Sequence, residues 1–421
     1  MNLNEIEQKT LAELRIMAKE LGLKDFMELP KEELGMEVLK ATAKTTKDKE
    51  EYIMVEGILE IQKDRTHGVL HTDGVLSGEN DVYISGSQIK KFNLRVGDVV
   101  SGPARLPKDN ERYLSLLRVD KVMGRDATEA TKRPTFHKLT TIFPNKQIKL
   151  ETTPDVLSTR LIDLLAPIGF GQRAMIVAPP KAGKTTLLKE IAKGISENNK
   201  DIKLMVVLVG ERPEEVTDMQ RSVKGEVFAS NFDEMAEHNC RVAEMALEKA
   251  KRLVEYGENV VMLMDSITRL ARAYNITMPT SGKTLSGGFD PVALYPPKRF
   301  FGAARNFENG GSLTIIATAL VETGSRMDDL VYEEFKGTGN MELHLDRRLQ
   351  QKRVFPAIDV VKSGTRNEEL LLDKDVLNQS WRIRRMLEMI EGDENPTEIL
   401  IGQMRKTKSN KEFLATLHES V

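Results

Sequence analysis

The stretch Gly169–Glu190, GFGQRAMIVAPPKAGKTTLLKE, decides the fold of this chain. It begins with an apolar run at Ala174–Ala178, passes through a loop rich in lysine and glycine, and continues into residues typical of a helix. A strand, a loop and a helix in this order form a phosphate-binding P-loop, in which backbone N–H groups and the helix N-terminus surround phosphate oxygens. The alternative is a simple turn in an unrelated α/β protein, but the flanking strand and helix favour a nucleotide site.

Individual residues of the loop suit this chemistry. Around Gly183 the backbone can turn its N–H groups toward phosphate, Lys184 can reach the terminal phosphates, and the hydroxyl of Thr185 can hold Mg²⁺. The usual pattern G-x-x-x-x-G-K-[ST] begins with glycine, whereas this chain has Ala178 at that position. Because alanine disfavours positive φ, we expect a slightly less permissive loop.

The composition predicts a soluble cytoplasmic protein of two or three domains. The 421 residues are 40% hydrophobic and 30% charged, enough for a sizeable core. The net charge of −2 restricts nucleic-acid binding to local patches. Cys240 is the only cysteine, which excludes an internal disulfide and a cysteine-based zinc site. We expect no signal peptide and no membrane contact, because no stretch approaches the ~20 consecutive apolar residues of a membrane span.

Changes in periodicity divide the chain into four parts. Residues 1–47 have apolar side chains at helical spacing and predict a small helical bundle, which either binds a partner or packs on its neighbour. Residues 48–125 contain five strand-like runs, which suit a barrel of the oligonucleotide-binding type. Residues 126–150 form a basic linker broken by prolines, and residues 151–421 alternate strands with helices as an α/β domain does.

The expected elements can be given by residue. The barrel strands are expected at Tyr52–Ile61, Gly68–Leu70, Asp81–Ile84, Val99–Ala104 and Arg112–Val122. The buried strands of the α/β domain are expected at Ala174–Ala178, Lys203–Val209, Asn259–Met264 and Leu313–Ala319. The basic residues of the linker, which are most simply solvated, are Lys132, Arg133, Lys138, Lys146 and Lys149.

Two carboxylates follow strands of the α/β domain. Asp265 ends an apolar strand, which is the Walker B arrangement that places a carboxylate beside Mg²⁺, although it could merely cap the helix that follows. Glu211 ends the preceding strand, where it could orient an attacking water or be an exposed turn carboxylate.

Two later stretches are unlike ordinary connections. Met278–Pro291 is a long glycine-rich loop, and loops of this kind inside a compact domain are usually functional. Its Gly282-Lys283-Thr284 imitates the end of a P-loop, but no apolar strand precedes it, so we reject a second nucleotide site. Glu322–Met327 directly follows a strand. Later arginines, including Arg366, could form solvated ion pairs, or one could reach a neighbouring subunit's γ-phosphate in a ring.

Six motifs along the chain fit one family. They are APPKAGKT at Ala178–Thr185, GERPEEVTDMQRSV at Gly210–Val223, DSITRLARAYN at Asp265–Asn275, PPKRFFGAARN at Pro296–Asn306, YEEFKGTGNMELHLDR at Tyr332–Arg347 and RVFPAIDVVKSGTR at Arg353–Arg366. Together they resemble the Rho family of bacterial transcription termination factors over essentially the whole chain. The resemblance implies a multidomain protein with a small helical bundle, a β-barrel of the OB-fold type and a RecA-like P-loop ATPase domain.

The activity that the resemblance implies is that of a motor. It implies a homohexameric ring that hydrolyses ATP at its subunit interfaces and moves 5′-to-3′ along single-stranded RNA. The transcript is then released from RNA polymerase, with transcription elongation factors as further partners.

The resemblance also implies roles at the nucleotide. Glu211 activates water, Asp265 and Thr185 hold Mg²⁺, and Arg366 is an arginine finger supplied in trans beside Lys184. The residues implied to contact ATP are Gly169, Phe170, Gly171, Gln172, Arg173, Ala174, Lys181, Ala182, Gly183, Lys184, Thr185, Thr186, Arg212 and Phe355, whose ring would stack on adenine.

Two RNA sites are implied as well. A primary site on the barrel would consist of Thr66, His67, Gly68, Val69, Leu70, His71, Asp81, Val82, Tyr83, Glu111, Arg112 and Tyr113. A second site in the ring channel would use Lys283, Thr284, Leu285, Ser286, Gly287 and Arg326.

The chain departs from the family pattern on the barrel. Where the family usually carries two phenylalanines and an arginine, this chain has His67, Val69 and His71. Losing one stacking platform removes ~1–3 kcal/mol per base, so we expect a weaker primary site, which Lys132, Arg133 and Lys138 of the linker could offset. Gly210 also stands where an aspartate is common, removing one charged contact between subunits.

Two other classes of protein remain as alternatives. A subunit of a rotary ATP synthase shares the RecA-like motor but should lack the glycine-rich channel loop and ignore RNA. A passive RNA-binding ring would use ATP only for assembly, yet Glu211, Asp265 and Arg366 together indicate hydrolysis.

Overall fold

The computed structural model describes the chain except for residues 1–8, 24–25, 28, 43, 46–50, 63–65, 76–77, 79, 109–110, 391–394 and 418–421. Parts of the expected N-terminal bundle and of its junction with the barrel fall outside the described residues. The chain divides into two compact units. One contains Met1–Phe136 with Met245–Leu253, and the other contains His137–Glu244 with Val254–Val421.

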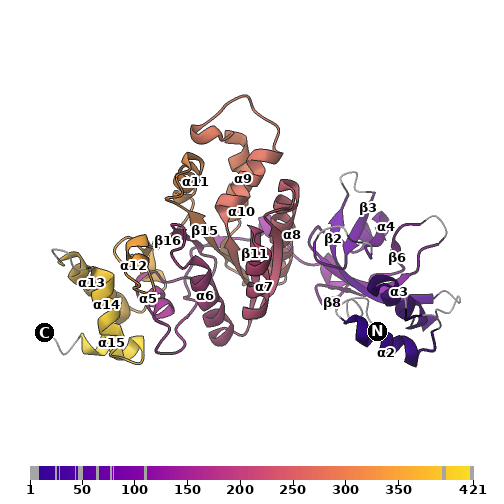
Figure 1. Ribbon diagram of the computed structural model, residues 1–421, viewed down its shortest axis with the longest axis horizontal. Helices are drawn as coiled ribbons and strands as arrows, with labels where there is room; N and C mark the ends of the chain where they lie inside the picture. The colour runs from indigo at the N-terminus through magenta and orange to yellow at the C-terminus, as the bar shows by residue number, and fades with distance from the viewer. Residues whose placement is uncertain are drawn as a thin grey trace. The chain divides into compact units, whose positions relative to one another are not determined.

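The first unit holds the N-terminal helices and a β-barrel (Figure 1). Its elements, apart from part of α8, are α2 (Leu11–Glu20), α3 (Lys31–Thr42), β1 (Lys44–Thr45), β2 (Glu51–Ile61), β3 (His67–His71), β4 (Val82–Ser85), α4 (Gly86–Lys91), β5 (Val99–Arg105), β6 (Leu114–Leu116), β7 (Lys121–Val122), β8 (Arg125–Asp126) and the 3₁₀ turn η1 (Glu129–Thr131).

The N-terminal helices pack on the barrel. Helix α2 begins with a capping box in which Thr10 and Glu13 bond each other's backbone N–H groups. Leu14 and Ala18 of α2, together with Leu34 and Val38 of α3, join the same hydrophobic cluster as the barrel interior. Of the two readings left open by the sequence, the structure therefore supports packing on a neighbour.

The barrel closes because β2 pairs with both β3 and β5. The closed circuit runs β2-β3-β4-β6-β5, with β4 and β6 parallel and the other pairs antiparallel. The expected fifth run is broken into β6 and β7, both of which pair with β5. Helix α4 was not expected, although Ser85 and Gln88 form a capping box that marks its start.

The linker after the barrel is not simply solvated. Arg133 is buried, and its guanidinium donates to both carboxylate oxygens of Asp98, which is fully buried. This pair fixes the linker to the barrel unit and removes Arg133 from the basic residues available to RNA. The expectation of a solvated linker is corrected at this position, while Lys132 and Lys138 are exposed.

The second unit is an α/β domain. Its elements, apart from those shared with the first unit, are β9 (Thr141–Ile142), α5 (Leu157–Leu165), β10 (Arg173–Ala178), α6 (Lys184–Asn198), β11 (Ile202–Glu211), α7 (Pro213–Ser222), β12 (Glu226–Asn231), β13 (Asn259–Asp265), α9 (Ile267–Thr277), η3 (Ser286–Gly288), η4 (Pro291–Leu294), α10 (Tyr295–Phe301), β14 (Arg305–Phe307), β15 (Ser312–Leu320), α11 (Arg326–Lys336), β16 (Met341–His344), α12 (Arg347–Gln351), β17 (Gly364–Thr365), η5 (Glu368–Leu370), α13 (Lys374–Glu388), α14 (Pro396–Met404) and α15 (Asn410–Thr416). Helix α8 (Ala236–Glu255) and the 3₁₀ turn η2 (Phe136–Lys138) straddle the division.

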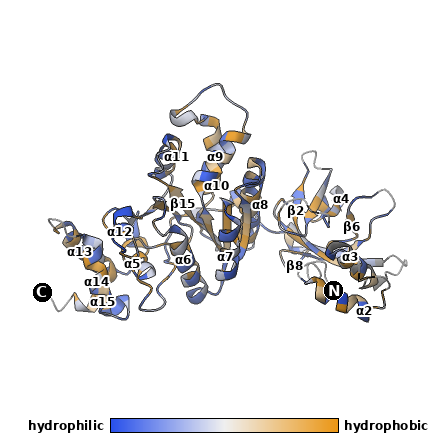
Figure 2. Cartoon of the chain, in the orientation of Figure 1, coloured by the Kyte–Doolittle hydropathy of each residue, from blue (hydrophilic) through white to orange (hydrophobic). Residues whose placement is uncertain are grey.

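A parallel sheet forms the centre of this domain. Its order is β12-β11-β13-β15-β10-β16-β17, parallel except for β17. The short strand β14 pairs antiparallel with β15, and β9 pairs antiparallel with β14. The four expected strands are β10, β11, β13 and β15, and their side chains are largely buried, as parallel strands covered on both faces require. The surrounding helices carry both hydrophobic and hydrophilic segments, as amphipathic helices do (Figure 2).

The C-terminal helices α13, α14 and α15 gather at one end of the domain (Figure 1). They share a hydrophobic cluster with α5 and the P-loop helix α6. Arg160 of α5 is fully buried and donates to the carbonyls of Met404 and Thr407, at 3.1 and 2.9 Å. These contacts join the end of the chain to the motor sheet. No helix among the described residues is long and apolar enough to cross a membrane.

Candidate nucleotide and RNA sites

The P-loop has the geometry that the sequence predicts. Strand β10 ends at Ala178, and α6 begins at Lys184 directly after Gly183, whose φ of 92° is left-handed. Ala178 still belongs to the strand, so glycine is not required there. Lys181 is exposed and has a φ of 65°, so it is a second residue of the loop in the left-handed region.

The carboxyl ends of neighbouring strands bring two acids to this loop. Lys184 forms an ion pair with Asp265 at the end of β13, and its Nζ lies 3.5 Å from Oε1 of Glu211 at the end of β11. The hydroxyl of Thr318 on β15 donates to Asp265 at 2.8 Å. Residues from the adjacent strands β11, β13 and β15 and from the helix that follows β10 therefore meet at one edge of the sheet.

Both alternatives for these acids are excluded by their surroundings. The following helix α9 is capped by Ser266, whose hydroxyl accepts from the backbone N–H of Arg269 at 3.2 Å, so Asp265 is not its cap. Glu211 is only 2% exposed and is not a surface turn residue. Burial raises the pKa of Glu211, and the charge of Asp265 raises it further against the opposing effect of Lys184.

The donor set at this edge fits a nucleotide with Mg²⁺. Thr185 lies in the first turn of α6, where a hydroxyl can serve as a ligand, and Asp265, which pairs with the adjacent Lys184, offers a buried carboxylate. Oε1 of Glu211 has no hydrogen-bond donor among the described residues, although Lys184 and Arg269 lie within ion-pair distance. A buried acceptor left open at a phosphate site is suited to holding a water molecule.

Arg269 was missed as a site residue. It donates to the carbonyl of Gly210, and its Nε lies 3.3 Å from Glu211. The sequence did contain an indication of this role, because Arg269 lies in the first turn of α9, directly after the Walker B strand.

Other predicted nucleotide contacts also lie at this edge. Asp346 lies two residues beyond the carboxyl end of β16, and its backbone N–H donates to the carbonyl of Ala357. This bond places Phe355, two residues before Ala357, near the same edge of the sheet. Phe355 is 45% exposed, which leaves it accessible to a base. Arg212 is exposed at the start of α7, while Thr186 is exposed and Ala182 is buried in the P-loop.

Two predicted groups lie at the opposite edge of the sheet. Gly169–Ala174 precede and begin β10, whose six residues at ~3.3 Å each separate its two ends by about 20 Å. Arg366 follows β17, and its backbone N–H donates to the carbonyl of Asn340 at 2.9 Å, just before β16 begins. The same Asn340 accepts from Gln172 and from the backbone of Arg173. Within one chain, these residues therefore do not meet the P-loop.

An aromatic platform is present on the barrel. The rings of His67 and Tyr83 stack with centroids 5.6 Å apart and an interplanar angle of 26°. Elsewhere on the barrel, the guanidinium of Arg112 lies 5.3 Å from the ring centre of Tyr113. Thr66 is exposed and lies 2.9 Å from Nδ1 of His67. Tyr83 is exposed and His67 is half-buried, and a partly exposed stacked pair suits contact with unpaired bases.

Other predicted RNA contacts on the barrel need correction. Val69 is almost fully buried, and the side chains of Leu70 and Val82 belong to the barrel core, so none of the three offers a free surface to RNA. Gly68 is buried as well. Glu111 accepts two hydrogen bonds from Arg105, at 2.6 and 2.8 Å, but it is exposed, so its contact with RNA stays a prediction.

His71 is a buried, paired cation rather than a free one. Its ring nitrogens contact Asp81 at 3.1 Å and Glu60 at 2.8 Å, and both His71 and Asp81 are 1% exposed. Burial opposes charging of the ring, but the hydrogen bonds and charges of the two acids prevail and raise the pKa of His71 to about 9. His71 and Asp81 were predicted to contact RNA, but their side chains are buried against each other and are not free to do so.

The two predicted channel loops contact each other. Ser281–Gly288 are all exposed, including Lys283, Thr284, Leu285 and Ser286, and Asp290 holds the loop by accepting from the backbone of Ser281 at 2.6 Å. A Cβ on Gly287 would lie 2.6 Å from the backbone nitrogen of Met327, so the loop touches the first turn of α11. Arg326 is exposed in that turn.

Comparison with known proteins identifies the family. Residues 55–128 match the model of the Rho termination factor RNA-binding domain, and residues 158–365 match the nucleotide-binding domain of the ATP synthase alpha/beta family. The chain is 52% identical to the transcription termination factor Rho of Bacillus subtilis, over 100% of this chain and 96% of that protein. It is 50% identical to that of Salmonella typhimurium over 100% of both chains. This chain belongs to the Rho family.

Solved structures agree with the fold. A type III secretion system ATPase of pathogenic bacteria superposes with a TM-score of 0.53 and 25% identity, over 64% of this chain and 86% of that one. The match to ATP synthases is confined to the motor that these proteins share with Rho. The full-length relatives and the RNA-binding domain therefore exclude the rotary subunit, and the chain is an RNA-dependent ATPase of the Rho type.

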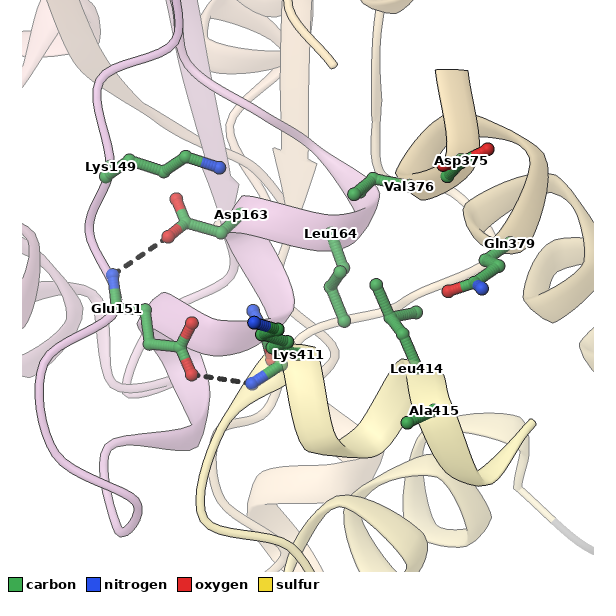
Figure 3. Close-up of a pocket in the computed structure, with 11 residues that line it drawn as sticks. Lys149, Glu151, Asp163, Leu164, Asp375, Val376, Gln379, Lys411, Leu414 and Ala415 are labelled. Carbon is green, nitrogen blue, oxygen red and sulfur yellow. Dashed lines mark hydrogen bonds between the residues drawn. The ribbon is translucent and has the colours of Figure 1, made fainter. Parts of the chain in front are cut away.

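A separate pocket of about 500 Å³ lies between α5, α13 and α15 (Figure 3). Its buried acid, Asp163, accepts from the backbone N–H groups of Leu150 and Glu151 at 3.0 and 2.8 Å. Burial raises the pKa of Asp163 to about 7 against these hydrogen bonds. Its partners, these backbone groups and the side-chain amide of Gln147, all belong to the same domain, so we assign Asp163 to the fold.

Proposed function

We propose that six copies of this chain form a ring that hydrolyses ATP between subunits, moves 5′-to-3′ along single-stranded RNA and releases the transcript from RNA polymerase. The observation that carries the proposal is the division of one nucleotide site between two sheet edges. Lys184, Glu211 and Asp265 lie at one edge, whereas Arg366 lies at the other. A site that one chain cannot complete requires a neighbouring copy, head to tail, and such contacts close into rings.

The proposed chemistry assigns each residue one task. The P-loop N–H groups and Lys184 bind phosphate, with Thr186, Lys181 and Arg212 beside them, and Phe355 stacks on adenine. Glu211 accepts a hydrogen bond from the attacking water and orients it toward the γ-phosphate. Thr185 and Asp265 would hold Mg²⁺, which neutralises phosphate charge when bound. Arg366 of the neighbouring subunit would stabilise the charge that develops on the transferred group.

The channel loops would couple RNA to this site. Helix α9 begins beside Asp265 and leads directly into Met278–Pro291. Arg272 of α9 donates at 2.7 and 2.6 Å to Asp328 of α11, which also accepts from Thr323 at 2.6 Å. A displacement of Lys283 or Arg326 by RNA would therefore be transmitted to α9, which begins at the nucleotide site.

The barrel would capture RNA first, through His67, Tyr83 and Arg112. The helical bundle, barrel and linker, with bounds of 1–47, 48–125 and 126–150, would precede the motor of 151–421. Elongation factors would meet the ring at the polymerase.

Steady-state ATP hydrolysis tests the proposal. We expect poly(C), poly(U) or mixed RNA to stimulate the wild type, and Arg366→Ala to remove that stimulation. Hydrolysis that is equally fast without RNA would contradict an RNA-gated motor, and an absence of hydrolysis would indicate a passive ring. The ranking of the polymers measures whether His67 and Val69 have relaxed pyrimidine preference.

A further inference from the structure

Arg366 extends from a segment whose backbone is fixed while its side chain is free. Its backbone N–H donates to Asn340, and the hydroxyl of the preceding Thr365 donates to the carbonyl of Pro167 at 2.7 Å. The residue is exposed, and no described residue forms a hydrogen bond or ion pair with its guanidinium. Such a side chain can reach another molecule, but only in a direction that its backbone sets.

Helix α13 holds this segment on its N-terminal side. The guanidinium of Arg384 donates to the carbonyl of Ser363 at 3.0 Å and to the carbonyl of Leu165. A Cβ on Gly364 would lie 3.4 Å from the same guanidinium, so the arginine packs directly on the strand that leads to Arg366. One planar group thus ties the β17 segment to α5.

The same helix holds the segment on its C-terminal side. The indole Nε1–H of Trp381 donates to Oε1 of Glu368 at 2.8 Å, and Oε2 of Glu368 lies 3.9 Å from Arg384. Trp381 and Arg384 are three residues apart, so they lie on the same face of α13. Arg366 is therefore bracketed at Ser363 and at Glu368 by neighbouring side chains of one helix.

This bracket borders a cavity of about 390 Å³ that the arginine finger also lines. Asn340, Glu342, Lys362, Arg366, Glu368 and Arg384 form its polar wall. The cavity lies at the sheet edge that faces away from the chain's own P-loop, where a neighbouring subunit's nucleotide site would be presented.

We propose that Arg384, with Glu368 and Trp381, is a positioning group that aims Arg366 at the nucleotide of the neighbouring subunit. The inference rests on the proposed role of Arg366 in trans. A guanidinium can hold two carbonyls and a carboxylate at once, because its donors lie in a rigid plane. Loss of Arg384 removes the restraint at Ser363 and the cation beside Glu368, while the bonds to Asn340, Pro167 and Trp381 remain. The segment can then shift, and a displacement of about 1 Å at a catalytic group can lower kcat by roughly 10²-fold.

Mixed rings test this role. Subunits carrying Arg366→Ala retain the P-loop, and subunits carrying Lys184→Ala retain the finger, so hydrolysis in a mixture arises only where the two meet. We expect Arg384→Gln added to the Lys184→Ala subunit to lower the activity of the mixture by roughly 10–10²-fold in kcat. The same change added to the Arg366→Ala subunit should have little effect, and KM for ATP should stay unchanged in both mixtures.

The difference between the two mixtures distinguishes a positioning role of Arg384 from a role in folding. A general destabilisation by Arg384→Gln would lower activity in both mixtures, and equal losses or no loss in either would overturn the proposal. Arg405→Gln in the Lys184→Ala subunit is the matched control, since Arg405 is exposed at the end of α14, and it should change nothing. If the starting mixture of Lys184→Ala and Arg366→Ala is inactive, the trans role of Arg366 itself fails, and the positioning role fails with it.

Discussion

Arg366 and Lys184 lie at opposite edges of the same parallel sheet. Arg366 is bonded to Asn340, where β16 begins, whereas Lys184 opens the helix that follows the carboxyl end of β10. Because β10 and β16 are parallel neighbours in register, the full length of the strands separates the two side chains. One nucleotide can contact both only if two subunits supply them.

This separation predicts that substitution of Lys184 and substitution of Arg366 impair different steps, ATP binding in the first case and catalysis in the second. Lys184→Ala removes a phosphate contact and should weaken ATP binding together with hydrolysis. Arg366→Ala should leave ATP affinity nearly unchanged and lower kcat by roughly 10³-fold or more, as expected for an arginine finger. Equilibrium binding of a fluorescent ATP analogue, measured beside steady-state kinetics, distinguishes the two. Equal losses of affinity would place both residues on one subunit's nucleotide.

Gly287 makes the contact between the two channel loops testable. Gly287→Ala would place a Cβ 2.6 Å from the Met327 backbone and should lower RNA-stimulated hydrolysis by about tenfold, since the loops must separate. Gly288→Ala is the control, because Gly288 has a similar φ of 79° against 74° but open space around it. Similar losses in both variants would mean that backbone strain alone explains the effect.

The His67–Tyr83 platform should carry much of the affinity of the barrel for RNA. His67→Ala removes one stacking face and should weaken binding by ~1–3 kcal/mol, whereas His67→Phe should bind at least as tightly as the wild type. Titration of a labelled pyrimidine oligonucleotide, without ATP, measures both. Unchanged affinity of His67→Ala would show that bases stack elsewhere.

Arg133 should matter for stability and not for RNA. Arg133→Ala leaves the buried Asp98 without its cation, with the backbone N–H of Arg95 still donating to it, and breaking a buried ion pair in this way typically costs about 3–5 kcal/mol. Lys132→Ala changes an exposed neighbour and should alter stability by less than ~0.5 kcal/mol. Chemical denaturation of the two variants tests this difference. A well-folded Arg133→Ala variant with weakened RNA binding would restore the original reading of the linker.

Asp163 predicts how stability depends on pH. Its pKa rises from an ordinary 3.8 to about 7 on folding, so the folded state binds the extra proton between these values. Stability from this group is therefore complete below about pH 4 and is lost as pH rises toward 7, by at most ~4 kcal/mol. Asp163→Asn cannot ionise. Its melting temperature should fall below that of the wild type at pH 5 and approach or exceed it at pH 8. A difference that stays constant with pH would contradict the prediction.

The sequence by itself determined the order of elements and the chemistry at one sheet edge. The P-loop, Glu211 and Asp265 were predictable because each follows an apolar strand, and parallel strands bring their carboxyl ends together whatever the rest of the fold does. The five barrel runs were predictable for a similar reason, since the alternation of side chains is local. Arg269 escaped because its role depends on a neighbouring strand, although it stood in a recognised motif.

Only the tertiary structure decided which residues are free to act. His71, Asp81 and Arg133 look like surface charges in the sequence, yet each is buried against a partner at least ten residues away, His71 with Asp81 and Arg133 with Asp98. The family resemblance implies that Arg366 acts in trans, but only the register of β10, β16 and β17 places it away from its own P-loop. Burial and pairing over such distances depend on how the sheets close, and a local pattern of residue types carries no information about that closure.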